Sequence, residues 1–243
     1  FLLTASRDWW RAFARRVPGR RACLGAALAA SLLAAGCGSR PEEGFLAPVA
    51  DAVSGSTPHT LLVATTRKRD DRPGTFFNGE RSTAFDLAEF TVSVPPNHKH
   101  GEVELPQSGA GNPQTDFVVR DGGYIENEKT FVAQLNRRLA QKPRGQRSII
   151  IFIHGYNTLF AEGLYRFAQV VHDSKSTAVP VHFSWASRGQ LSDYVYDNNS
   201  ATAARDRLER VLRLLGLLLE RAGAELCARA GQRGLLARHA QIA

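Results

Sequence analysis

The feature that most constrains the fold is an uninterrupted apolar run, Ser148–Ile153, that leads directly into a His-Gly pair. Its apolar residues are isoleucine and phenylalanine and do not alternate with polar ones. Such a run predicts a strand buried on both faces, as in a parallel sheet. We expect a helix over residues 159–174 and a further strand over 179–185. This order predicts an α/β fold with parallel strands joined by crossover helices.

The flanking segments extend the pattern. Upstream, we expect strands over residues 60–66, 89–94 and 117–119, and a helix over 127–141. The charged stretch from Arg67 to Gly79 predicts a surface loop. Downstream, Asn199 or Ser200 is a candidate N-cap for a last helix. Its apolar face is expected to hold Leu208, Val211, Leu212 and Leu215.

The turn after the buried run, His154-Gly155-Tyr156-Asn157, carries the clearest chemical signal. A strand that ends in His-Gly and is followed by a helix can aim a backbone N–H at an oxygen that becomes negative during acyl transfer. We expect the N–H of Tyr156 to be that donor and Gly155 to allow close approach. His154 and Asn157 are expected to shape the loop, with His154 making hydrogen bonds rather than acting as a base.

Several further motifs occur in a fixed order around this turn. They are Ala64-Thr65-Thr66-Arg67, Gly79-Glu80-Arg81, Val92-Ser93-Val94-Pro95-Pro96, His98–Glu104, Phe183–Gly189, Tyr194-Val195-Tyr196-Asp197 and Ala204-Arg205-Asp206. With them, residues from 60 to about 215 resemble a bacterial α/β-hydrolase family of undetermined function, often labelled esterase- or lipase-like. The resemblance implies an α/β-hydrolase-type sheet, hydrolysis of a small ester by a serine nucleophile, and no cofactor or metal. Trp185, Tyr194 and Tyr196 are candidates for an acyl pocket and equally for the core.

The chain departs from that family where the nucleophile should stand. The family pattern continues with a strand and a small-His-Ser-Met-Gly turn, then an acid and a His. Here Ser200 is the last Ser, Asp206 the last Asp, and no Gly-x-Ser-x-Gly occurs. The required order of Ser, acid and His therefore cannot follow the last helix. We expect a partial domain over residues 60–215, cut before the nucleophile elbow and without Ser-dependent esterase activity. A non-catalytic exported lipoprotein, either a pseudo-enzyme or a binding module, is the alternative.

Residues 216–243 are rich in Ala, Arg, Gly and Leu and lack the expected Val/Ile-rich strand. A frameshift near residue 216 is one explanation for this divergent tail. A genuine but divergent helix with a weakly helical extension is the other.

The N-terminus has the pattern of an export signal. Six Arg and one Asp precede Cys37, and residues 23–35 form an uncharged, mostly apolar run. This run is shorter than the roughly 20 residues of a membrane-spanning helix and is typical of a signal peptide. Leu33-Ala34-Ala35-Gly36-Cys37 resembles a bacterial lipobox, with Ala34 where Leu is usual. We expect residues 1–36 to be a signal peptide, Cys37 to be acylated and bind the periplasmic side of a membrane, and residues 37–59 to be a tether.

The net charge of +8 does not indicate a nucleic-acid partner. Most of the basic excess lies in the expected signal, and residues 37–215 hold 21 basic and 20 acidic residues. The basic triplet Arg67-Lys68-Arg69 is followed by two Asp and predicts a charged surface loop. His98 and His100 lack further ligands at metal-binding spacing, so we expect a solvated loop. Cys227 lacks the small neighbours of a nucleophile turn.

Overall fold

A computed structural model of the chain describes residues 40, 43–51, 53–222 and 225–230. The chain divides into two compact units, Phe1–Arg40 and Pro41–Ala243, and the description below concerns the second. The expected signal peptide, Cys37 and the last thirteen residues lie outside the described residues. None of the described helices combines the length and the apolar character needed to cross a membrane.

The described part of the second unit is built on one mixed sheet with the strand order β3-β2-β1-β5-β4-β6. Strands β1, β2 and β3 pair in an antiparallel meander, whereas β1, β5, β4 and β6 run parallel to one another. The parallel half is the part that the Ser148–Ile153 run predicted. The strands are β1 Thr57–Asp70, β2 Phe76–Val94, β3 Val118–Ile125, β4 Ser148–Ile153, β5 Val179–Ser184 and β6 Glu225–Ala230.

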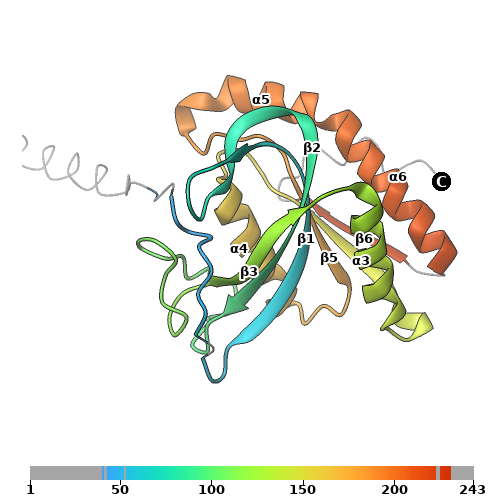
Figure 1. Cartoon of the computed structure of the whole chain (residues 1–243), viewed down its shortest axis with the longest axis horizontal. Coiled ribbons are helices and arrows are strands. Elements are labelled where there is room, and N and C mark those ends of the chain that lie inside the picture. Colours follow the sequence, from blue (N-terminus) through green and yellow to red (C-terminus); the bar gives the residue numbers. More distant parts are fainter. Residues whose placement is uncertain (1–39, 41–42, 52, 223–224, 231–243) are drawn as a thin grey trace, which may run out of the picture. The chain divides into compact units, whose positions relative to one another are not determined.

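Helices cover both faces of this sheet (Figure 1). Helix α4 packs on one face, and α3 and α6 pack on the other. Helix α5 leads into α6 at one end of the sheet (Figure 1). The architecture is therefore an α/β arrangement of three layers, as expected. The helices are α3 Glu128–Ala140, α4 Phe160–Asp173, α5 Tyr194–Ala203 and α6 Arg205–Ala222.

Strand β4 shows why the sequence folds into these layers. Ile150 and Phe152 belong to the core cluster on the α4 side. Ile149, Ile151 and Ile153 belong to the cluster that contains the apolar faces of α3 and α6. Because successive side chains of a strand point to opposite faces, a strand without polar positions must be covered on both sides. The expectation of a doubly buried strand is confirmed.

The expected surface loop at residues 67–79 is instead a long β-hairpin. Strand β1 continues to Asp70 and β2 begins at Phe76, so the turn is limited to residues 71–75. The turn is braced by Arg72, whose guanidinium donates to Asp70 and to Glu43. The hairpin was not predicted because charged residues interrupt the apolar alternation of both strands in this region.

The region expected as a tether includes a segment packed on the domain, here called the strap (residues 43–51). Phe45 and Leu46 of the strap are buried in the core. The N–H of Leu46 donates to the carbonyl of Gly74 at 2.8 Å. Gly74 has a left-handed φ of 68°, and a Cβ there would lie 2.7 Å from the Ala47 nitrogen. The strap therefore requires glycine at the hairpin turn.

The end of the described domain also differs from expectation. Asn199 and Ser200 lie within α5 rather than capping the last helix, and the Ser200 hydroxyl donates to the Tyr196 carbonyl. Helix α6 extends to Ala222, and β6 then pairs in parallel with β4. A strand thus follows the last helix although the Val/Ile-rich sequence expected of it is absent, because backbone pairing with β4 does not require such a sequence.

Candidate functional site at the carboxyl end of the parallel strands

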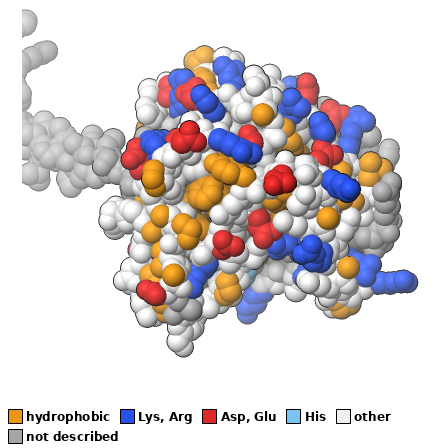
Figure 2. All heavy atoms as spheres, viewed as in Figure 1, with side chains coloured by type: hydrophobic (Ala, Val, Ile, Leu, Met, Phe, Trp, Pro, Cys, Tyr) orange, Lys and Arg blue, Asp and Glu red, His pale blue; other side chains and the backbone are white. Residues whose placement is uncertain are grey.

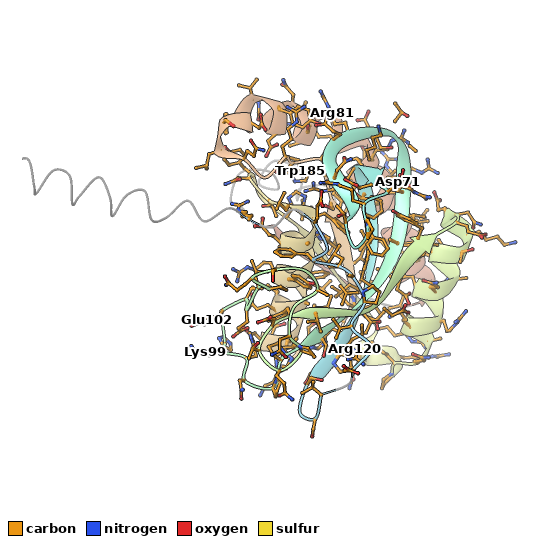
Figure 3. The ribbon with its side chains drawn as sticks, turned by 60° about the vertical axis from the view of Figure 1, so that its left-hand side comes forward. Asp71, Arg81, Lys99, Glu102, Arg120 and Trp185 are labelled. Carbon is orange, nitrogen blue, oxygen red and sulfur yellow. The ribbon has the colours of Figure 1, made fainter. Side chains whose placement is uncertain are left out.

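The candidate site is built from two loops that follow neighbouring parallel strands. Residues 154–159 connect β4 to α4, and residues 185–190 follow β5. In open α/β sheets, ligands bind beyond the carboxyl ends of such strands. Figure 3 shows Trp185 at this end of the sheet and Lys99 and Glu102 toward the other. The expected oxyanion loop therefore lies where this fold places its chemistry.

Arg67 of β1 is hydrogen-bonded to both loops. Its side chain is fully buried, and its Nε donates to the Ser184 hydroxyl at 2.8 Å. Its two terminal nitrogens donate to the carbonyl oxygens of Asn78, Ser187 and Thr158 and lie 3.4 Å from His154 Nε2. Burial lowers the pKa of Arg67 to about 9, against the opposing charge of Asp197. The expectation that Arg67 belongs to a surface loop is wrong.

His154 joins the two loops and is itself buried. Its ring stacks on Trp185 at 4.8 Å, and the indole Nε1 donates to the His154 carbonyl at 3.0 Å. The two ring nitrogens lie 2.8 Å from the Gly155 carbonyl and 3.0 Å from the Trp185 carbonyl. Burial, Arg67 and His182 hold the pKa of His154 well below its usual value. The ring is therefore neutral at physiological pH.

Asp197 of α5 fixes the loop from the other side. Its buried carboxylate accepts hydrogen bonds from the Ser187 hydroxyl at 2.5 Å and from the N–H groups of Asn157 and Arg188. The Ser187 oxygen in turn accepts the N–H of Thr158 at 3.0 Å. Asn157 has a φ of 56°, a left-handed conformation that Asn tolerates better than most residues. Asp197 therefore holds the loop in its turn.

Tyr156 lies at the surface of the loop. Its phenolic oxygen donates to the Leu191 carbonyl, and its ring meets the edge of Tyr194 at 5.3 Å. Its backbone N–H belongs to the turn at the carboxyl end of β4, where this fold is expected to place an oxyanion donor.

The three aromatic residues predicted for a pocket or the core lie in different surroundings. Trp185 is buried against His154, whereas Tyr194 is 61% exposed. The Tyr196 ring lies under the guanidinium of Arg188, at 3.7 Å from its centroid. None of the three lines the cavity beside the loop.

That cavity measures about 430 Å³ and opens between the strap, the hairpin turn and the start of α4. Its apolar wall includes Phe45, Phe77 and Leu159. Arg67, Arg72, Arg188, Glu80 and Asp193 contribute charged groups. Volumes of this size are usual for small-molecule sites.

The described residues do not assemble a catalytic triad or a metal site. Beside the candidate site, the Ser184 hydroxyl accepts from Arg67 and the Ser187 hydroxyl donates to Asp197, and neither contact is with a His. The described residues contain no group of three His, Cys, Asp or Glu side chains placed to hold a metal ion.

His98 is not in a solvated loop as expected. Its ring is buried between Glu104, at 2.7 Å, and Asp173, at 2.9 Å. These contacts dock the loop after β2 on α4.

Comparison with known proteins agrees with the geometry. Residues 127–222 match a family described as alpha/beta hydrolase of unknown function (DUF900). The chain carries an α/β-hydrolase-like domain. The match covers the hydrolase-like segment from α3 to α6, which includes the His154–Asn157 turn and Asp197. No curated protein and no solved structure matches the chain.

Sequence reasoning missed Arg67 and Asp197 as organisers of this hydrolase-like site. Both residues stand in motifs that carry the family resemblance, Ala64-Thr65-Thr66-Arg67 and Tyr194-Val195-Tyr196-Asp197. A charged residue that ends a β-rich or aromatic motif was the available signal.

Proposed function

We propose that the hydrolase-like domain descends from ester-type serine hydrolases and that the 243-residue chain does not itself turn over esters. In this proposal, the Tyr156 N–H is the oxyanion donor of the ancestral reaction. A negative oxygen of a tetrahedral intermediate would be stabilised by that amide. Arg67, His154 and Asp197 would hold the loop that carries it.

One observation carries the proposal. The Tyr156 amide lies in the turn at the carboxyl end of β4, while the neighbouring strand β6 ends at Ala230 in the sequence Ala228-Arg229-Ala230-Gly231. In the resembling family, the strand after the last helix leads into the nucleophile turn. Here neither Ser nor Thr occurs after residue 202, and Cys227 is the only thiol in that stretch. An oxyanion donor without a nucleophile does not form an acyl-enzyme.

The test is hydrolysis of 4-nitrophenyl butyrate by the purified 243-residue chain, with and without an organophosphate inhibitor. We expect the rate to equal that of buffer containing an equal mass of albumin. Turnover that the organophosphate abolishes would refute the proposal, because it would require an activated Ser. Turnover that a thiol-alkylating reagent abolishes instead would point to Cys227 and would refute it equally.

A non-catalytic binding module is the second candidate, and the open cavity favours it. The cavity is lined by groups of the strap, the hairpin and α4 that do not depend on a nucleophile. Saturable binding of a small molecule without turnover would support this function over simple loss of activity.

We further propose that the domain is exported and anchored through an acylated Cys37. Support comes from the Arg-rich start, the short apolar run and the lipobox-like sequence before Cys37. These residues lie outside the described ones, so the proposal rests on sequence alone.

A further inference from the structure

The cavity beside the candidate site contains hydrogen-bond donors that have no partner. Thr75 lines it and is only 8% exposed, and its hydroxyl has no hydrogen-bond partner among the described residues. A buried hydroxyl without a partner is unfavourable, so a ligand oxygen that accepts from it gains free energy. The unpaired hydroxyl is a first indication that the cavity takes a ligand with acceptor oxygens.

The start of α4 adds donors of the same kind. Phe160 and Ala161, the first two residues of this 14-residue helix, line the cavity. The N–H groups of a first helical turn have no acceptor within the helix, and the N-terminus of a helix favours negative charge. The N–H of Leu159, one position earlier, is already taken by the Glu162 carboxylate. Phe160 and Ala161 follow Leu159 and carry the next two amides of this helical turn.

The cavity lining carries charges of both signs, with Arg67, Arg72 and Arg188 beside Glu80 and Asp193. Arg72 and Arg188 are already paired with carboxylates, Arg72 with Asp70 and Arg188 with Glu80. Arg67 is different, because all of its hydrogen bonds go to neutral acceptors and no carboxylate of the described residues lies within ion-pair distance. A buried cation without a direct counter-ion is stabilised by a nearby negative charge. Arg67 would attract the ligand through its field rather than through a hydrogen bond.

The remaining wall is apolar. Phe45 of the strap, Phe77 of β2 and Leu159 before α4 line the cavity. Hydrocarbon placed against these side chains leaves water, which favours binding in proportion to the area buried. An inorganic anion would leave this wall unused.

We propose that the cavity binds an amphipathic monocarboxylate. The carboxylate accepts from the Thr75 hydroxyl and from the first amides of α4, in the field of Arg67, and the aliphatic tail packs on Phe45, Phe77 and Leu159. The inference goes beyond the proposed ancestry, because it needs neither a nucleophile nor turnover.

The test is calorimetric titration of the purified 243-residue chain with octanoate, and with acetate, 1-octanol and inorganic phosphate as comparison probes. We expect saturable octanoate binding, with acetate and 1-octanol at least about tenfold weaker, because each lacks one half of the ligand. The substitution Thr75→Val removes the hydroxyl and keeps the shape. It is expected to weaken octanoate binding about tenfold while leaving thermal stability unchanged or higher.

Two further variants make the test specific. Thr60→Val removes a hydroxyl that is bonded to Thr91 outside the cavity, and it should leave the octanoate affinity unchanged. Ala161→Leu adds side-chain volume at a buried position that lines the cavity and should abolish binding, with circular dichroism checking that the fold is kept. Because every variant keeps residues 1–36, any binding by that segment cancels from the comparison.

Three results would overturn the proposal. They are the absence of saturable octanoate binding, equal octanoate affinity in Thr75→Val and the unsubstituted chain, and phosphate binding tighter than octanoate binding. None of these results bears on ester turnover, so failure here is distinct from failure of the proposed loss of catalysis.

Discussion

The carboxylate of Asp197 accepts the backbone N–H of Asn157 at 3.1 Å, across 40 residues of sequence. The same carboxylate oxygen accepts the hydroxyl of Ser187 at 2.5 Å. One buried side chain of α5 thereby fixes the loop after β4 and the loop after β5 together. The position of the Tyr156 amide, one residue before Asn157, depends on this contact.

Removing the Asp197 carboxylate should therefore loosen both loops. Asp197→Ala leaves the Ser187 hydroxyl and two backbone N–H groups without their acceptor in a buried place. We expect the free energy of unfolding to fall by about 2–4 kcal/mol, measured by urea denaturation. The exposed Asp206 gives the matched control, since Asp206→Ala should change it by less than about 0.5 kcal/mol. Equal stability of the two variants would contradict the role assigned to Asp197.

Arg67 offers a second test of the same framework. Arg67→Met keeps most of the side-chain volume but leaves the carbonyls of Asn78, Ser187 and Thr158 without their donors. We expect a loss of about 3 kcal/mol or more, and amide hydrogen exchange should rise in residues 154–159 before the rest of the sheet. The neighbouring exposed residue supplies the comparison, because Lys68→Met removes a charge without removing a buried contact. Unchanged amide hydrogen exchange in residues 154–159 would mean that Arg67 does not hold this loop in place.

The parallel half of the fold was predictable because its signals are local. The unbroken apolar run of β4 and the apolar stripe of α4 are visible within short windows, and both elements were found within one residue of their predicted bounds. The site loop was predictable for a similar reason, because His154-Gly155 directly follows the buried strand.

The rest depended on partners far away in the chain. The buried Arg67 is hydrogen-bonded to Ser184 and Ser187, which lie more than 110 residues later in the chain. The residues next to Arg67 in the sequence are charged and by themselves indicate a surface position. Strand β6 has no apolar run, and its existence follows from pairing with β4. The strap is fixed by Gly74 and by β3, where the N–H of Val49 donates to the Val119 carbonyl. The amino-acid composition around each of these segments does not indicate these long-range contacts.

Charges of both signs mix on the surface of the domain. Figure 2 shows Lys and Arg side chains interleaved with Asp and Glu over the face in view.

A pair of histidines at the other end of the sheet should make the domain sensitive to acid. His59 Nε2 lies 3.1 Å from His172 Nδ1, a contact in which one ring nitrogen donates and the other must be unprotonated. Burial and the neighbouring His172 lower the pKa of His59 to about 4, and burial lowers that of His172. Because the unfolded chain takes up protons near pH 6.5 and the folded chain does so only near pH 4, stability should fall as pH drops through this interval. His59→Gln should flatten that dependence in urea denaturation.

His98 provides the internal contrast for this experiment. Hydrogen bonds from His98 to the carboxylates of Glu104 and Asp173 outweigh the effect of burial and raise the pKa of His98. Its stabilising contribution is therefore complete below pH 6.5 and is lost as pH rises through the raised value. His98→Gln should remove the slope above pH 6.5. Because His98 also lowers the pKa of His172, the same substitution should shift the acid limb as well. Retention of the slope above pH 6.5 in His98→Gln would contradict the assignment.

The proposed membrane anchor makes a sharp prediction for one thiol. If Cys37 is acylated, radiolabelled palmitate should enter the protein in growing bacterial cells, and the protein should sediment with membranes. Cys37→Ala should abolish the label and leave an unprocessed precursor. Cys23 lies in the segment expected to be removed and Cys227 in the region of β6, so neither Cys23→Ala nor Cys227→Ala should change the label. Persistence of the label in Cys37→Ala, or its loss in Cys227→Ala, would place the lipid elsewhere.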